Sequence, residues 1–93
     1  MPAQAGTRFP RQRPDAVFRQ LDDDWVIYDP TTNRLHVLNL SAALVWTHCT
    51  GERDTREIVE AIRGAYASAP PTAEIERDVS ATLDQFRAEG LLA

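Results

Sequence analysis

Lysine is absent from this sequence, and cysteine occurs only once among its 93 residues. All ten basic residues are therefore arginines. The lone Cys49 excludes a disulfide within the chain and agrees with a reducing compartment. Long apolar runs are missing too: no segment approaches the ~20 residues of a membrane-spanning helix, and the N-terminus has no apolar stretch of signal-peptide length. These absences predict a cytoplasmic protein with no membrane contact.

The residue patterns of common catalytic and metal sites are also missing. The four glycines stand apart from one another, so no glycine-rich loop can cradle a phosphate. His36, His48 and Cys49 are the only imidazole and thiol candidates for a metal, and adjacent side chains such as the last two point about 100° apart on a helix. Cys49 has no defined base beside it that would make it a nucleophile. We therefore expect no metal, no cofactor and no catalytic residue, which favours a binding module over an enzyme.

Acidic residues outnumber basic ones, and the excess lies in the body of the chain. Fourteen acidic residues against ten arginines give a net charge of -4, and three of those arginines fall within residues 1–14. The rest of the chain therefore carries seven arginines and fourteen acids. A negatively charged body repels the phosphates whose capture drives most nucleic-acid binding. We therefore expect no nucleic-acid partner.

The first fourteen residues differ from the rest in composition. They hold three prolines and three arginines, with Phe9 as the one large apolar residue. Such a segment buries too little apolar surface to offset the entropy of ordering it. We expect residues 1–14 to form a disordered basic arm and residues 15–93 to form a single domain.

Three short segments rich in branched and aromatic residues predict three strands: Val17–Leu21, residues 25–28 and residues 35–38. The gaps between them hold turn-forming residues, three consecutive aspartates from Asp22 and then residues 29–33 with proline and asparagine. Strands this close in sequence predict an antiparallel meander. The segment 35–38 lies either at an edge, open to strand addition, or inside the sheet and paired on both sides.

After residue 40 the apolar pattern changes to the 3.6-residue period of helices. The expected helices span residues 41–49, 54–66 and 72–89, with a break at two consecutive prolines after the second. The expected N-caps are Asn39 or Ser41, then Asp54 or Thr55, then Thr72, and glycines at 51 and 90 suit the C-terminal positions. The expected core residues are Phe18, Trp25, Ile27, Val37, Leu44, Trp46, Ile58, Ile62, Val79, Leu83, Phe86 and Leu91.

The segment from Leu35 to Trp46, followed by Cys49-Thr50-Gly51 and Thr55-x-x-Ile58, resembles the PqqD family, and the resemblance continues to Gly90-Leu91. The resemblance implies an α+β, winged helix-turn-helix-like fold, a three-stranded antiparallel sheet followed by three helices. It also implies a precursor-peptide recognition element, a non-catalytic adaptor that binds the leader of a ribosomally synthesised peptide by strand addition. The modifying enzyme it serves would be a radical S-adenosylmethionine enzyme, as in pyrroloquinoline quinone biosynthesis.

Carried onto this sequence, the family groove lies between the third strand and the third helix. The strand contributes Arg34, Leu35, His36, Val37 and Leu38, and the helix contributes Asp78, Val79, Thr82, Gln85 and Phe86. The resemblance leaves the precursor peptide, the enzyme and the oligomeric state open.

A winged-helix regulator that binds DNA is the main alternative, because the order of elements is compatible with one. The third expected helix lacks the basic face that a recognition helix needs. Its charged residues are Glu74, Glu76, Asp78, Asp84 and Glu89 against Arg77 and Arg87. A catalytic subunit whose active site forms only within a complex is a further alternative.

Overall fold

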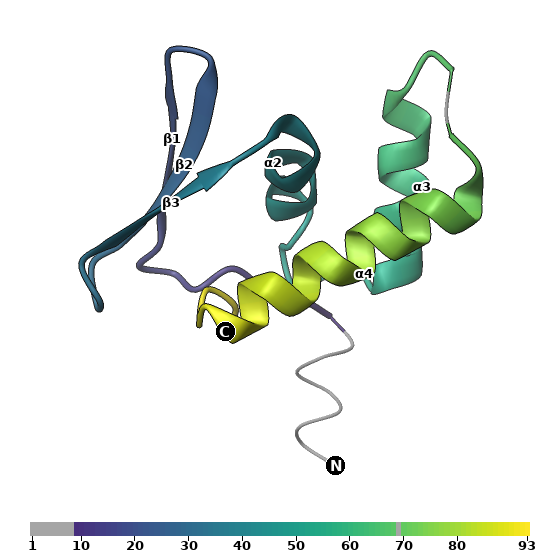
Figure 1. Cartoon of the computed structure of the whole chain (residues 1–93). Helices are drawn as coiled ribbons and strands as arrows, with labels where there is room; N and C mark the ends of the chain where they lie inside the picture. Colours follow the sequence, from purple (N-terminus) through teal and green to yellow (C-terminus); the bar gives the residue numbers. More distant parts are fainter. Residues whose placement is uncertain (1–8, 69) are drawn as a thin grey trace.

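The structure is a computed structural model of the chain that describes residues 9–68 and 70–93. Three strands come first, β1 (Val17–Leu21), β2 (Asp24–Asp29) and β3 (Arg34–Leu38), followed by α2 (Leu40–Thr47), α3 (Thr55–Ala65) and α4 (Thr72–Ala88) (Figure 1). This order confirms the expected α+β fold. In the described part of the chain, no helix combines the length and apolar character that crossing a bilayer requires.

The strands form one antiparallel sheet in the order β1-β2-β3. Asp22 and Asn33 take positive φ values of 56° and 58° in the two turns, a conformation that aspartate and asparagine tolerate better than most residues. Since β2 is the central strand, β3 lies at an edge of the sheet. Within the residues described, this removes the alternative in which β3 is paired on both sides.

The register of the sheet decides which side chains reach the core. Ile27 pairs with His36, and Trp25 pairs with Leu38, and these residues face the helices. Because side chains alternate along a strand, Val37 must face the opposite way, and it is 66% exposed. The prediction that Val37 belongs to the core is wrong, since one strand cannot bury both it and its neighbour on the same side.

Two of the three helices begin at side-chain caps that were expected from the sequence. The Asn39 side chain accepts a hydrogen bond from the Ala42 N–H and caps α2. Asp54 and Glu57 form a reciprocal capping box at the start of α3, which satisfies two otherwise unpaired donors. The expected cap at Thr72 is wrong, because the carbonyl of Pro71 already accepts the first hydrogen bonds of α4.

The core lies where α4 packs against α2 and α3, and Ile27 and Leu38 extend it to the inner side of the sheet. Trp46 and Phe86 meet there edge to face, with ring centroids 5.3 Å apart. After α4, Gly90 takes a φ of 71°, and the Leu91 N–H donates to the Phe86 carbonyl. This pattern is a Schellman motif, which turns the chain so that Leu91 is fully buried. The position of the end of α4 is thus fixed.

Part of the expected arm is folded against the domain. Residues 1–8 lie outside the described residues, but Gln12 donates its backbone N–H to the Cys49 carbonyl and Arg13 donates to the Leu91 carbonyl. Gly51, with a φ of 84°, donates in turn to the Pro10 carbonyl. Residues 10–13, which were expected to belong to the arm, are therefore hydrogen-bonded to the domain. Gly51 therefore binds the N-terminal segment, and α2 ends earlier, at Thr47.

Arg13 joins the N-terminal segment to the sheet and to the end of α4. Its guanidinium donates to Asp29 at 3.2 Å, to Asp15 at 2.7 Å and to the Gly90 carbonyl at 2.9 Å. Thr31 supplies a further hydrogen bond to Asp15 and, with Arg13, lowers the pKa of that carboxyl below its ordinary value. Three segments far apart in the sequence thus meet at one cation.

Asp29 is the buried member of this cluster, with 1% of its side chain exposed. Burial alone would raise the pKa of Asp29. Hydrogen bonds from the Thr32 hydroxyl and the Thr31 N–H, and the charge of Arg13, bring it below the ordinary value instead. The folded chain therefore holds this carboxylate in its charged form.

We predict that acid destabilises the domain through these carboxylates. Groups whose pKa is lowered on folding stabilise the fold above their unfolded pKa of about 3.9, and that contribution is lost as the pH falls through the folded pKa. Urea unfolding between about pH 6 and pH 3 should show a falling free energy of unfolding, and Arg13→Gln should lower stability at neutral pH and flatten this dependence. Arg56→Gln, an exposed arginine on α3, should leave the profile unchanged. An unchanged profile in Arg13→Gln would contradict the assignment.

Candidate peptide-binding site

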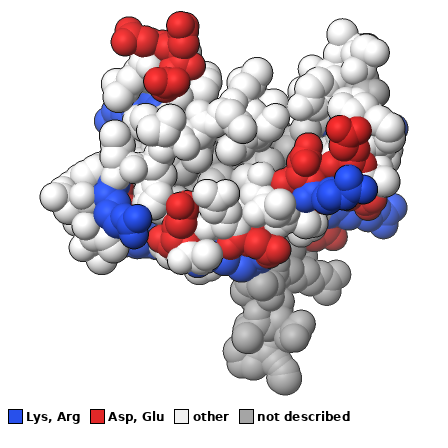
Figure 2. Space-filling view, in the orientation of Figure 1, with Lys and Arg blue, Asp and Glu red and all other residues white. Residues whose placement is uncertain are grey.

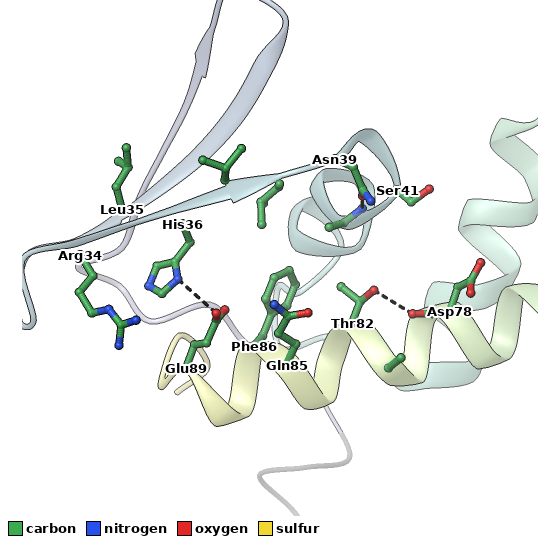
Figure 3. A pocket seen from close by; sticks show the side chains of 14 residues that line it. Arg34, Leu35, His36, Asn39, Ser41, Asp78, Thr82, Gln85, Phe86 and Glu89 are labelled. Atoms are coloured by element: carbon green, nitrogen blue, oxygen red, sulfur yellow. Dashed lines mark hydrogen bonds and ion pairs between the residues drawn. The ribbon is translucent and has the colours of Figure 1, made fainter.

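A groove of about 670 Å³ separates the free edge of the sheet from α4. Figure 3 shows β3 forming one wall of the groove and α4 the other. The residues that line it are Arg34, Leu35, His36, Val37, Leu38, Asn39, Ser41, Ala42, Asp78, Ala81, Thr82, Gln85, Phe86 and Glu89. An extended peptide could lie in this space alongside β3.

The hairpin geometry indicates which backbone groups of β3 face the groove. A two-residue loop separates the Leu21–Asp24 pair, and such a loop is flanked by a hydrogen-bonded pair. Hydrogen-bonded pairs alternate along an antiparallel ladder, so the β2 residues between those that bond to β1 must bond to β3. Their partners on β3 are Arg34, His36 and Leu38. The N–H and C=O groups of Leu35 and Val37 therefore point away from β2. These two residues therefore offer donors and acceptors to an added strand.

The helical wall of the groove is one stripe of α4. Asp78, Thr82, Gln85 and Glu89 follow one another at intervals of four, three and four residues, which places them on one face of the helix. The Thr82 hydroxyl donates to the Asp78 carbonyl at 2.8 Å. This stripe is polar, with Asp78 and Gln85 exposed and the other two half-buried, so it can bind side chains of a ligand without being needed for the core.

His36 lies at the floor of the groove with a free hydrogen-bonding position. Its side chain points from β3 toward α4, and Nδ1 lies 3.4 Å from Glu89 Oε2 (Figure 3). The other ring nitrogen, Nε2, is buried and has no hydrogen-bond partner among the described residues. Leaving a buried polar atom unpaired costs about 1–3 kcal/mol. A ligand that reached this nitrogen would recover part of that cost.

A small apolar cavity of about 30 Å³ adjoins the groove at its Asp78 end. It shares Ser41, Asp78 and Thr82 with the groove and is otherwise lined by Val45, Ile62, Tyr66, Pro70, Ile75 and Val79. This volume fits about one methyl group or one water molecule. An apolar side chain of a peptide could begin to enter here.

Nine of the ten residues expected at the site line this groove, and Val79 does not. The Val79 side chain is 2% exposed and packs in the core with Ile75 and Leu83, its neighbours four residues away on α4. Sequence reasoning missed Glu89, although its spacing of four residues from Gln85 and seven from Thr82 is a signal that could have found it. It also missed the residues after β3 that close one end, Asn39, Ser41 and Ala42.

The thiol and imidazole outside the groove have ordinary structural surroundings. Burial raises the pKa of the Cys49 thiol to about 12, and the thiol donates to the Val45 carbonyl. At neutral pH it is therefore protonated and a poor nucleophile. Partial burial, followed by the nearby charge of Arg53, lowers the pKa of His48. Neither residue faces the groove.

A family model described as coenzyme PQQ synthesis protein D (PqqD) matches residues 24–92, from the start of β2 to Leu92. The chain belongs to the PqqD family. Proteins of the PqqD family are non-catalytic, peptide-binding adaptors that recognise precursor leader peptides. The resemblance inferred from the sequence is thus confirmed. Among curated proteins, no sequence matches this chain.

Two solved structures share the fold of this PqqD family member. One is titled "TbiB1 in Complex with the TbiA(beta) Leader Peptide", with a TM-score of 0.73 and 23% identity over 88% of this chain and 93% of that one. The other is titled "Lasso peptide synthetase B1 complexed with the leader peptide", with a TM-score of 0.76 and 21% identity over 91% and 98%. At these identities the similarity establishes the fold alone.

Proposed function

We propose that this chain binds the leader of a ribosomally made precursor peptide as a fourth strand beside β3 and presents it to a separate modifying enzyme. One observation carries the proposal: the free edge of β3 faces a groove whose opposite wall is an exposed stripe of α4. Strand addition to an exposed edge is a common mode of peptide recognition. Membership of the PqqD family and the leader-bound state of both similar structures support the same assignment.

The energetics require apolar contacts as well as main-chain hydrogen bonds. Each hydrogen bond contributes about 0.5–1.5 kcal/mol net, and ordering a flexible leader costs about 2–5 kcal/mol. The ladder offered by Leu35 and Val37 is short, so it only offsets that cost. Apolar side chains of the leader, directed at Phe86 and the adjoining small cavity, supply the surplus. A dissociation constant in the micromolar range or somewhat tighter follows from this balance.

The identity of the enzyme depends on the pathway, and two classes are in view. The family description names coenzyme PQQ synthesis, for which the partner would be a radical S-adenosylmethionine enzyme, and one similar structure is titled as part of a lasso peptide synthetase. The two classes are distinguished by assaying the enzyme encoded beside this chain on a substrate that carries the leader. The partner enzyme should modify that substrate only when this chain is present. An enzyme that modifies the substrate equally well without this chain is not its partner.

Fluorescence anisotropy with a labelled leader peptide tests the binding role itself. The leader of the precursor encoded beside this chain should bind. The segment of the same precursor that follows the leader, and a scrambled leader, should bind at least tenfold more weakly. Equal affinity for all three peptides would overturn the proposal. A labelled random DNA duplex in the same assay tests the winged-helix alternative, which predicts binding that weakens steeply with salt.

A further inference from the structure

The side of the sheet that faces away from the helices is apolar. We call it the outer sheet face and define it by the apolar residues that alternate onto this side of the three strands: Val17, Leu21, Val26, Tyr28, Leu35 and Val37. Leu21, Tyr28, Leu35 and Val37 are 53%, 36%, 57% and 66% exposed, so large apolar side chains dominate the surface. Contiguous exposed apolar surface on a small domain commonly marks an interaction site.

Val26 shows that these side chains form a cluster rather than scattered contacts. It is 4% exposed, yet it does not belong to the main hydrophobic core. It sits on the central strand, paired with Arg19 on β1 and with Val37 on β3. The outer sheet face is therefore one contiguous apolar surface, with a buried centre and exposed apolar side chains around it.

The charges beside the outer sheet face are predominantly acidic. Asp22, Asp23 and Asp24 follow one another at the tip of the β1–β2 hairpin, next to Leu21, and appear as a separate acidic group in Figure 2. Asp24 pairs with Leu21 and so lies on the same side of the sheet. Arg19 is the cation of this face. A partner with an apolar patch bordered by lysine or arginine would complement both features.

The outer sheet face is continuous with the leader groove. Leu35 and Val37 belong to the face and also line the groove, because they stand on the edge strand. A leader paired with β3 would direct alternate side chains to the same side of the enlarged sheet. A protein docked on the face would therefore contact the adaptor and its bound leader together.

We propose that the outer sheet face is the docking surface for the modifying enzyme, which presents an apolar patch bordered by basic side chains and binds the leader-loaded chain more tightly than the free chain. This inference rests on the proposed function, because the leader completes the surface. It assigns the two sides of β3 different tasks: the edge binds the leader, and the outer side binds the enzyme.

The test measures two affinities for each variant: that of the leader, by anisotropy, and that of the modifying enzyme encoded beside this chain, by biolayer interferometry on the leader-loaded chain. The double variant Leu21→Ser/Tyr28→Ser removes apolar surface outside the groove. It should keep leader affinity within twofold and weaken enzyme binding tenfold or more. Leu40→Ser, an apolar residue that is 63% exposed and lies outside this face, is the matched control and should change neither affinity.

Asp22→Asn/Asp23→Asn tests the charge complementarity separately. It should weaken enzyme binding severalfold at low salt and make that binding less sensitive to salt, without changing leader affinity. Circular dichroism confirms that each variant is folded.

Unchanged enzyme affinity in both double variants would overturn the docking assignment. A second copy of the chain as occupant would appear in sedimentation as a concentration-dependent dimer that Leu21→Ser/Tyr28→Ser abolishes with enzyme affinity intact, and that result would overturn it as well. If the chain without substitutions did not bind the leader, that result would instead contradict the proposed function, so the two failures are distinguishable.

Discussion

Val37→Pro should weaken leader binding at least about tenfold while leaving the domain folded. The Val37 N–H is directed at the groove, so proline removes a donor that the leader needs and places its ring where the added strand would lie. The lost hydrogen bond alone accounts for about 0.5–1.5 kcal/mol, and the clash adds to it. Anisotropy with the labelled leader measures the loss, and circular dichroism monitors the fold.

Gln20→Pro is the matched control for this variant. Gln20 occupies the corresponding position on β1, the other edge of the sheet, where the same alternation directs its N–H away from β2. This substitution should leave leader affinity within twofold. Equal weakening by both prolines would mean that the sheet, rather than the groove-facing edge, is responsible. Unaltered binding in Val37→Pro would contradict strand addition beside β3.

Phe86→Ala should lower the free energy of unfolding by about 3–5 kcal/mol. Phe86 is 2% exposed, packs against Trp46, and forms part of the groove floor, so its removal leaves a cavity at the junction of core and site. A domain of this size has only about 5–15 kcal/mol of stability in total, so the variant should be partly unfolded at mild urea concentrations. Urea unfolding followed by tryptophan fluorescence measures the change.

Gln85→Ala provides the comparison from the neighbouring position on α4. Gln85 is exposed and lines the groove without entering the core, so its truncation should change stability by no more than about 0.5 kcal/mol. Similar urea midpoints for the two variants would contradict the division of α4 into a core stripe and a groove stripe.

The strands and helices could be predicted from the sequence because their signals are local. The capping box of Asp54 and Glu57 and the positive φ of Asn33 each depend on a few neighbouring residues. The pairing order of the strands does not. Whether residues 35–38 lay at an edge or inside the sheet depended on partners elsewhere in the chain, and the sequence alone left both options open.

Two features of the N-terminal segment were missed for one reason, since both depend on contacts between distant segments. Residues 10–13 hold little apolar surface, yet they are ordered through backbone hydrogen bonds to the segment at Cys49 and to the C-terminal turn. The composition of the segment could not reveal those partners. The cluster at Arg13 was missed for the same reason, because Asp29 and Gly90 approach it only in the folded chain.

At the site, the residue types were easier to predict than the phase of the helix. The family resemblance placed the groove on α4, but a rotation by one position separates a core residue from a groove residue. Val79 therefore belongs to the buried stripe, whereas Glu89 belongs to the groove. On β3 the alternation of a strand left less freedom, and all five expected residues line the groove.

Amide hydrogen exchange in the isotopically labelled chain, with and without saturating leader peptide, tests strand addition most directly. The amides of His36 and Leu38 face β2 and should be protected in both states. The amides of Leu35 and Val37 should exchange quickly in the free chain and become protected only when the leader is bound. Binding of the leader without new protection at these two amides would contradict the account.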